Sequence, residues 1–165
     1  MRHIISVLLE NESGALSRVV GLFSQRGFNI ESLTVAPTDD ATLSRMTVVT
    51  ECDNDEVEQI TKQLHKLVDV LKVYDLAYST HIEREIMLVK IRANTRDLRD
   101  EIKCMSDIFK GRIVDLTPDL YTVEIIGVSG KLDNFLTAVS QQAEIVEVVR
   151  SGVCGISCGE RSLRI

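Results

Sequence analysis

Residues 10–18 read Glu-Asn-Glu-Ser-Gly-Ala-Leu-Ser-Arg and join an apolar strand to an amphipathic helix. Gly14 lies just before the predicted start of that helix, where a residue without a side chain lets the backbone approach a ligand closely. The first N–H groups of a helix lack intrahelical partners, and the helix dipole adds partial positive charge at the same end. This turn therefore has the features of a site for a small carboxylate that is held by backbone groups.

A second turn, Gly27-Phe28-Asn29-Ile30-Glu31, follows the same predicted helix. The side-chain amide of Asn29 carries an oxygen that can accept a hydrogen bond from an ammonium group. Together the two turns suggest a site for a free amino acid. A helix N-cap at one end and a glycine C-cap at the other would explain the same residues without any ligand, so both interpretations stay open.

The first half of the chain reads as β-α-β-β-α-β. Residues 3–9 alternate as a strand, and residues 15–26 carry apolar side chains at helical spacing. Residues 30–36 and 43–50 predict two further strands, joined by a turn at residues 37–40. Asp53 and Glu56 form a capping box that begins a second amphipathic helix, and residues 70–76 form the last strand. This order predicts a four-stranded antiparallel sheet with two helices on one face.

The second half repeats this order after a polar break at residues 79–81. Strands are predicted at residues 84–92, 112–116, 121–126 and 145–149, with one helix after the first strand and another after the third. The predicted fold class is therefore α+β, with two ferredoxin-like βαββαβ domains, residues 1–77 and 83–165. The second half lacks the glycine and asparagine turns of the first, so we expect the two domains to differ in function.

Composition and charge describe a globular protein with an acidic surface. The 165 residues are 44% hydrophobic and 27% charged, and the formal net charge is −6. Nucleic-acid binders generally carry a basic patch, so we expect no nucleic-acid partner. The apolar run at residues 4–9 ends at Glu10 and no cleavage-like segment follows, so we expect no export signal, no membrane segment and a cytoplasmic location. Reduced thiols are then expected at Cys52, Cys104, Cys154 and Cys158.

Three patterns with catalytic or metal-binding associations are better explained otherwise. Residues 155–159, Gly-Ile-Ser-Cys-Gly, match a nucleophile elbow, but that motif needs a later histidine and all three histidines lie upstream. Cys154 and Cys158 have no second pair of ligands at metal-binding spacing. The pair Asp39-Asp40 lies in a predicted hairpin turn, where turn chemistry explains it. The sequence thus predicts no catalytic residues and no metal site.

The predicted sheets leave one face without helices. Strands such as residues 4–9 and 43–49 carry apolar side chains in both registers, so this face must also be covered. A second copy of the chain could cover the face or place its edge strand beside the first. In such a homodimer the Gly14 turn of one protomer would meet the Asn29 turn of its neighbour, and ligand binding would be linked to assembly.

The two turns carry a resemblance to a known family. Residues 11–18 and residues 27–35, Gly-Phe-Asn-Ile-Glu-Ser-Leu-Thr-Val, resemble the first ACT domain of the small regulatory subunit of acetolactate synthase (acetohydroxyacid synthase), most closely its short bacterial isozyme III type. Further similar stretches extend the resemblance over nearly the whole chain: residues 43–47, 63–70, 83–90, 129–133 and 150–152. Cys154 and Cys158 do not belong to the pattern and are given no role.

The resemblance implies a non-catalytic subunit that activates a separate large catalytic subunit and makes it sensitive to feedback inhibition by valine. That large subunit performs the first shared step of branched-chain amino-acid biosynthesis. Thiamine diphosphate, magnesium and FAD would belong to the large subunit, with no cofactor in this chain. Residues 1–77 would bind valine and form the homodimer, and residues 83–165 would contact the large subunit. The resemblance places valine across the dimer interface at Asn11, Gly14, Ala15, Leu16, Asn29 and Ile30.

Three other functions fit parts of the sequence. Another amino-acid-sensing regulator of the ACT type would show the same two turns. An enzyme of the acylphosphatase type would use Arg18 to grip a phosphate, although Arg18 lies a turn inside the predicted helix. An RNA binder of the RRM type reads bases with aromatic residues on its sheet, and an aromatic content of 4% without tryptophan argues against it.

Overall fold

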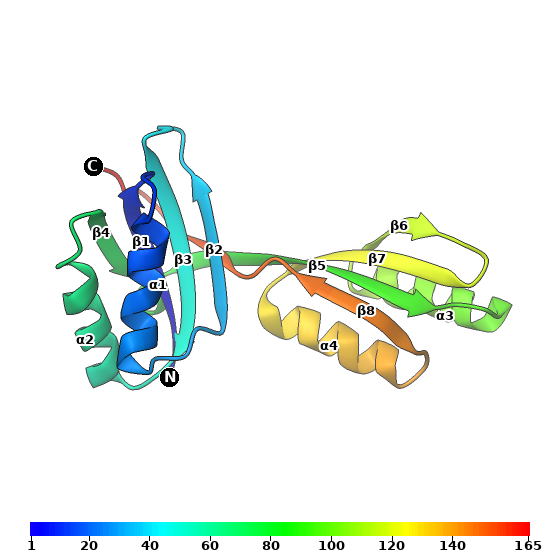
Figure 1. Cartoon of the computed structure of the whole chain (residues 1–165). Coiled ribbons are helices and arrows are strands. Elements are labelled where there is room, and N and C mark those ends of the chain that lie inside the picture. The colour runs from blue at the N-terminus through cyan, green and yellow to red at the C-terminus, as the bar shows by residue number, and fades with distance from the viewer. The chain divides into compact units, whose positions relative to one another are not determined.

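The computed structural model describes residues 1–165 and divides into two compact units (Figure 1). The first unit comprises Met1–Glu83 together with Val153–Ile165, and the second comprises Arg84–Gly152. Each unit contains an antiparallel sheet and two helices in the order β-α-β-β-α-β. The α+β class and the repeated ferredoxin-like pattern predicted from the sequence are therefore confirmed.

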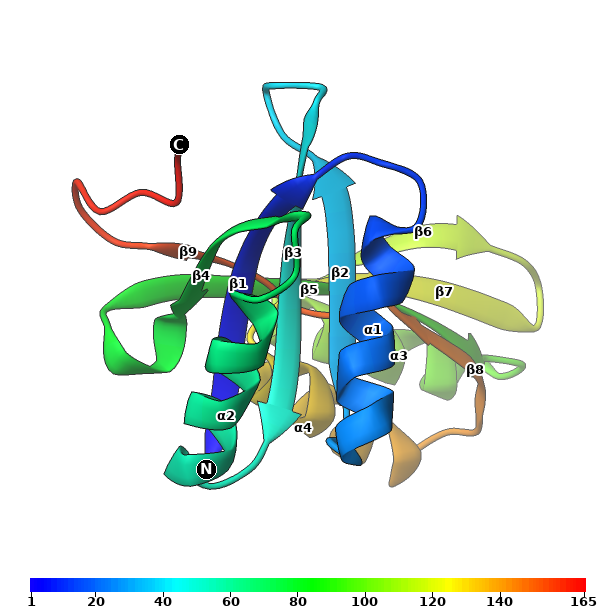
Figure 2. The ribbon, with the colours of Figure 1, turned by 60° about the vertical axis from the view of Figure 1, so that its left-hand side comes forward.

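The first unit has the elements β1 (Arg2–Glu10), α1 (Ala15–Arg26), β2 (Ser32–Pro37), β3 (Leu43–Glu51), α2 (Asn54–Leu64) and β4 (Val70–Asp75). Its strand order is β2-β3-β1-β4, and β2 and β4 are the edges. Helices α1 and α2 lie on the same face of the sheet (Figure 2). The predicted capping box begins α2, since the N–H of Glu56 donates to the Asp53 carboxylate over 2.8 Å.

Both faces of the central strand β1 are buried. Ile5 and Val7 point into the core beneath the two helices, where Phe23 and Ile60 meet them. The alternate side chains Ile4 and Leu8 point to the opposite face, yet they are only 2% and 3% exposed. This strand therefore needs a cover on each side of the sheet.

The second cover comes from the chain itself. The short helix η1 (Leu76–Tyr78) and the C-terminal strand β9 (Cys154–Ser157) contact one another, and Leu76 and Val153 join Ile4 in a small apolar cluster. Two hydrogen bonds fix Val153 to β2: its N–H donates to Ser32 Oγ over 2.8 Å, and its carbonyl accepts from Thr34 Oγ1 over 2.9 Å. The chain's own C-terminal segment thus covers part of the face for which we expected a second copy.

This segment also changes the domain boundaries. Residues 153–165 were expected in the second domain, but they pack with the first unit because β1 and β3 offer apolar surface there. Strand β9 has no period-2 apolar pattern, since its residues are Cys-Gly-Ile-Ser. The local sequence therefore gave no sign of this strand.

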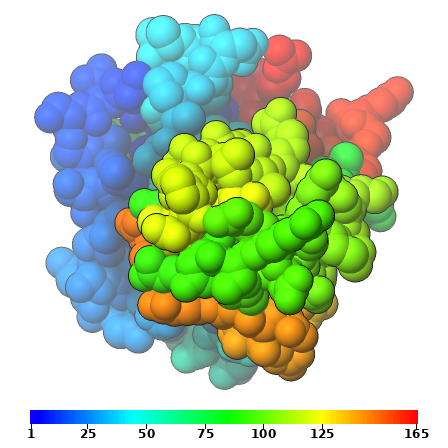
Figure 3. Space-filling model, turned by 90° about the vertical axis from the view of Figure 1, so that its right-hand side faces the viewer, coloured from blue at the N-terminus to red at the C-terminus, as the bar shows by residue number.

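The second unit has the elements β5 (His81–Arg92), α3 (Arg96–Ile108), β6 (Arg112–Leu116), β7 (Leu120–Gly127), α4 (Ser129–Ser140) and β8 (Ile145–Arg150). Strand β5 begins within the first unit, where β9 pairs with it, and its later part belongs to the sheet β6-β7-β5-β8. Met87, Val89 and Phe135 are fully buried in the core of this unit. Green, yellow and orange segments from distant parts of the sequence pack side by side in Figure 3.

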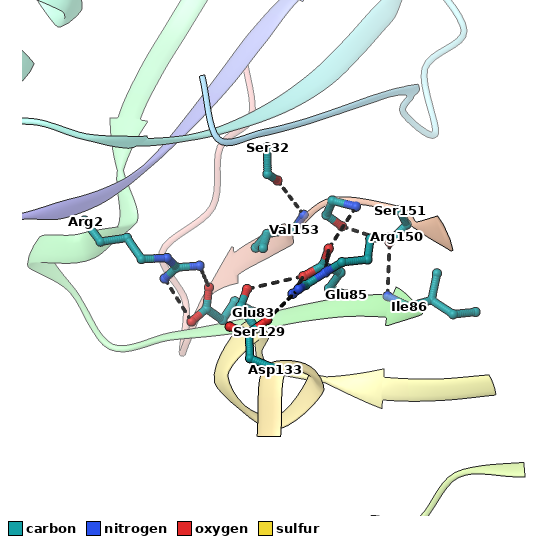
Figure 4. Close-up of polar contacts among 11 residues, drawn as sticks. Arg2, Ser32, Glu83, Glu85, Ile86, Ser129, Asp133, Arg150, Ser151 and Val153 are labelled. Atoms are coloured by element: carbon teal, nitrogen blue, oxygen red, sulfur yellow. Dashed lines mark hydrogen bonds and ion pairs between the residues drawn. The ribbon is translucent and has the colours of Figure 1, made fainter. Parts of the chain in front are cut away.

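A buried carboxylate organises the part of the second unit where the chain enters and leaves it (Figure 4). Glu85 is 6% exposed and accepts from Arg150 Nε over 3.0 Å and from Arg150 Nη2 over 2.9 Å. Ser129 Oγ and the N–H of Gly152 also donate to this carboxylate. The charge-assisted bonds with Glu85 raise the pKa of Arg150. The paired ions fix Glu85 of β5 against the end of β8.

None of the helices is both long enough and apolar enough to cross a membrane.

The docking of β9 can be tested at Gly155. A Cβ atom at this position would lie 2.8 Å from Cδ1 of Leu76, which is fully buried and has little room to move. We expect Gly155→Val to lower the free energy of unfolding by about 1–3 kcal/mol, because overpacking displaces the strand or its neighbours. Urea denaturation measures the change.

Gly130→Ala is the matched control, because a Cβ at Gly130 would have no neighbour within 4 Å. That substitution lies in α4 and should leave stability unchanged or slightly higher. Equal stability of Gly155→Val and the unmodified protein would contradict the packing of β9 on Leu76.

Candidate functional site

The Gly14 turn has a backbone conformation that favours glycine. Its φ is +86°, in the left-handed region, and it forms the N-cap of α1 without any side-chain cap. The N–H of Ala15 donates to the Glu12 carbonyl over 3.2 Å. By their positions in the first turn of the helix, Leu16 and Ser17 have N–H groups without intrahelical acceptors. The helix start can therefore offer backbone donors to an anion.

Asn11 connects this turn to the hairpin between β2 and β3. Its Nδ2 donates to the Ala41 carbonyl over 3.0 Å, and its backbone N–H donates to the Thr42 carbonyl over 2.8 Å. The side-chain oxygen of Asn11 forms no hydrogen bond within the chain and is available as an acceptor. Asn11 thus positions the Gly14 turn at the hairpin end of β2.

The second predicted turn lies at the other end of α1. Gly27 has a φ of +70°, and the N–H of Phe28 donates to the Phe23 carbonyl over 3.0 Å, so the helix ends in a Schellman arrangement. The carbonyl of Asn29 accepts from Thr50 Oγ1 over 2.6 Å, while the residue is exposed. Ile30 is half-buried against the core. The glycine C-cap that the sequence predicted is present.

The two turns of one chain cannot meet around one small ligand. Helix α1 has 12 residues, so about 18 Å of helix separates them. The first group comprises Asn11, Gly14, Ala15 and Leu16, and the second comprises Asn29 and Ile30. Any site that uses both groups needs a second copy of the chain.

Strand β2 offers a route to such a pairing. It is an edge of its sheet, and its outer backbone groups are free to pair with another strand. The Asn29 turn precedes the start of β2, and the Gly14 turn is attached to the hairpin at its end. If two β2 strands pair antiparallel, the Asn29 turn of one copy comes beside the Gly14 turn of the other.

An ion pair that the sequence did not predict lies against the Gly14 turn. Arg18 donates to the Asp69 carboxylate through Nε over 2.5 Å and through Nη2 over 2.9 Å. A Cβ at Gly14 would be 2.9 Å from Arg18 Nη1, so the guanidinium lies directly beside the turn. The hydrogen bonds from Arg18 lower the pKa of Asp69, although desolvation acts in the opposite direction.

The position of Asp69 in the sequence explains why its ion pair with Arg18 could not be predicted. It lies 51 residues from Arg18, in the connection between α2 and β4, and only the fold brings the two together. Its backbone carbonyl accepts from the N–H of Glu10 over 2.8 Å, which ties the same connection to the end of β1. This ion pair has a structural role. Because Arg18 is already bound to Asp69, its guanidinium is not free to bind a phosphate, as an enzyme of the acylphosphatase type would require.

No group of three or more His, Cys, Asp or Glu side chains is arranged to hold a metal ion. The four cysteines form no disulfide.

Two ferredoxin-like units, with a glycine turn before the first helix and an asparagine turn after it, define a protein of the ACT-domain regulatory class. Comparison with known proteins agrees: residues 5–72 match the family model for an AHAS small subunit-like ACT domain, and residues 84–159 match the model for the small subunit of acetolactate synthase. The chain belongs to the family of acetolactate synthase small subunits, which are regulatory rather than catalytic.

Individual relatives cover the whole chain. It is 65% identical over 164 residues to the acetolactate synthase isozyme 3 small subunit of Escherichia coli, which spans 99% of this chain and 100% of that protein. The acetolactate synthase small subunit of Haemophilus influenzae is 60% identical over 163 residues, or 99% of both chains. The crystal structure of the acetolactate synthase small subunit from Thermotoga maritima superposes with a TM-score of 0.87 at 32% identity, covering 98% of this chain and 99% of that one.

The Arg18–Asp69 pair predicts a pH-dependent contribution to stability. Because the pKa of Asp69 is lowered in the folded state, its stabilisation is present above the pKa of the unfolded chain and is lost as the pH falls through the folded value. We expect Asp69→Asn to lower the melting temperature at pH 7, and the difference from the unmodified protein to shrink below about pH 4. Melting curves across this range test the prediction.

Asp115→Asn serves as the control, because Asp115 is an exposed carboxylate that forms no ion pair. Its melting temperature should follow that of the unmodified protein at every pH. A constant offset between Asp69→Asn and the unmodified protein down to the acid limit would show that the charge of Asp69 is not what stabilises the turn.

Proposed function

We propose that this protein activates the large catalytic subunit of acetolactate synthase and confers feedback inhibition by valine. The observation that carries the proposal is the uncapped start of α1 at Gly14, in a chain that belongs to the small-subunit family throughout its length. The valine carboxylate would accept from backbone N–H groups of Gly14, Ala15 or Leu16, where the helix dipole also favours negative charge.

The remainder of valine would be bound by both copies of a homodimer. The amide oxygens of Asn11 and Asn29 are acceptors suited to the ammonium group, and Ile30 supplies apolar surface for the isopropyl group. Support for the two-copy arrangement comes from the length of α1 and from the edge position of β2. Since valine would touch both protomers, its binding and the geometry of the dimer would be coupled, and a coupling of about 1–3 kcal/mol suffices for regulation.

The catalytic chemistry would remain with the partner. Thiamine diphosphate, magnesium and FAD would bind the large subunit, and both subunits would work in the cytoplasm. Residues 84–152 would contact the large subunit, because this unit lacks the two turns that we assign to valine. An amino-acid sensor of the ACT type with another effector is the second candidate, since the same helix start would accept any α-amino acid carboxylate.

Reconstitution tests the proposal. Acetolactate formation by the purified large subunit should rise when this protein is added and fall again when valine is added. A panel of leucine, isoleucine and threonine distinguishes valine from other effectors. Failure of this protein to change the turnover of the large subunit would overturn the proposal.

Gly14→Asp tests the valine site. We expect this variant to activate the large subunit but to lose valine inhibition, because the new carboxylate would repel the carboxylate of valine and would draw Arg18 Nη1 away from its present position. Gly14→Asn is the matched control, because asparagine has the same shape without the charge and tolerates a positive φ better than most residues. Calorimetry with valine reports the binding directly. Unchanged valine affinity in Gly14→Asp would remove the site.

Removal of the second unit tests whether the first unit binds valine and the second contacts the large subunit. A truncation after Leu76 would also remove β9 and expose apolar residues such as Ile4, so the informative variant joins Glu83 to Val153 through a glycine-serine linker. We expect this protein to bind valine with unchanged affinity and to activate the large subunit at least about tenfold less effectively, a loss of about 1.4 kcal/mol. Full activation would show that the first unit alone contacts the partner.

A further inference from the structure

The C-terminal segment and the edge of the first sheet enclose a cavity whose lining includes none of the residues assigned to the Gly14 and Asn29 turns. Its volume is about 580 Å³, within the range of small-molecule sites. The floor is formed by two cross-strand pairs of β2 and β3, Thr34 with Thr47 and Ala36 with Arg45. The opposite wall is formed by residues 154–157 and 161–164, which include Ile156 and Leu163.

Arg45 is the charged group of the floor. Its Nε donates to Ser6 Oγ over 2.9 Å and its Nη2 donates to the Gly155 carbonyl over 3.2 Å, so both partners are neutral. Arg45 is half-buried and forms no ion pair with a carboxylate. Burial lowers the pKa of Arg45, and no neighbouring charge opposes this effect. A partly desolvated cation without a counterion would be stabilised by an anion in the cavity.

The remaining charges around the cavity are also mainly positive. Arg161 lies over the ring of Tyr74, with its Cζ 4.2 Å from the ring centroid, and forms no ion pair. Arg164 approaches the exposed carboxylate of Asp39 at 3.5 Å. Asp39 is the only acidic residue among those lining the cavity. Three arginines thus surround this space in a chain whose formal net charge is −6.

We propose that this cavity binds a small monocarboxylate with a short hydrocarbon chain and no amino group, with Arg45 as the residue that binds the carboxylate. The planar guanidinium suits a carboxylate, and Nη1 has no assigned partner within the protein. Ala36, Ile156 and Leu163 offer apolar surface for the hydrocarbon part.

The absence of an amino group follows from the same residues. An ammonium group would enter a space lined by three arginines, and the one carboxylate there, Asp39, is exposed and already near Arg164. An α-amino acid would therefore bring one charge that the cavity does not match. None of these residues belongs to the proposed valine site, although the cavity and the proposed dimer pairing share β2. Amide signals of the Gly14 turn and of the cavity report the two sites separately, so each can be disproved without the other.

Nuclear magnetic resonance of the full-length ¹⁵N-labelled protein tests the proposal with 3-methylbutanoate as the probe. We expect saturable shifts of the amide signals of Ala36, Thr47 and Ile156, with a dissociation constant between micromolar and millimolar. The uncharged 3-methylbutanamide, which has the same shape, should bind at least about tenfold more weakly, and valine should shift the signals of the Gly14 turn instead. No saturable shift up to about 10 mM 3-methylbutanoate, or equal binding of the amide, overturns the proposal.

Two variants assign the binding to this cavity. Arg45→Gln removes the charge and should weaken 3-methylbutanoate binding at least about tenfold. Arg45→Lys keeps the charge but loses the planar guanidinium, so it should weaken binding less than Arg45→Gln does. Ala36→Leu fills part of the cavity and leaves the charge of Arg45 unchanged. This variant should therefore weaken the binding of both 3-methylbutanoate and 3-methylbutanamide. Arg112→Gln is the control, because Arg112 is an exposed arginine in the second unit.

The alternative occupant is an acidic side chain of the large subunit. In that case 3-methylbutanoate would not bind the isolated protein, while Arg45→Gln would weaken its assembly with the large subunit. This outcome overturns the small-molecule proposal and assigns the cavity to a protein contact. Unchanged 3-methylbutanoate binding in both Arg45→Gln and Ala36→Leu also overturns it, because the probe would then bind elsewhere.

Discussion

Burial of the central strand β1 on both faces is the constraint on which the first unit depends. Its apolar residues occupy both registers, so a sheet with helices on one side would leave Ile4 and Leu8 in water. The chain resolves this by returning from the second unit and laying residues 153–157 against the helix-free face, together with Leu76. The C-terminal segment is thereby part of the first unit, and the two units are connected by two chain segments rather than one.

The length of α1 is a second constraint, because it decides whether one small ligand could contact both ends of the helix in a single chain. A helix of 12 residues places its uncapped start and its glycine-capped end too far apart for one small ligand. An effector that uses both ends must therefore bridge two molecules, and its binding energy is available to change how they associate. The Arg18–Asp69 pair holds the Gly14 turn in one conformation without a ligand. The conformational entropy that this turn would lose on binding a ligand is therefore smaller.

Positive charge is distributed unevenly over the molecule. Arg150 pairs with the buried carboxylate of Glu85 and so joins β5 to the end of β8. Arg45 differs, because its hydrogen-bond partners are a hydroxyl and a carbonyl while part of its hydration is lost. The C-terminal segment that covers β1 also lies against Arg45, since the Gly155 carbonyl accepts from its guanidinium. The same segment therefore stabilises the sheet and forms the wall of the cavity.

The sequence by itself determined the order of the elements and the nature of the two turns. Alternation and helical spacing act over a few residues, so the strands, the helices and the Asp53–Glu56 capping box were predicted close to their observed bounds. The turn at Gly14 before the first helix was likewise predicted, whereas the left-handed backbone of Gly14 was found only in the structure. The sequence also carried the family resemblance that the comparisons confirm.

Only the tertiary structure decided where residues 153–165 belong and which arginines have carboxylate partners. The bonds of Val153 to Ser32 and Thr34 span 119 to 121 residues, and the Arg18–Asp69 pair spans 51. Such contacts depend on which surfaces the sheet leaves uncovered, a property of the assembled strands that no local pattern records. The cavity beside Arg45 exists for the same reason, since its floor and its opposite wall come from opposite ends of the chain.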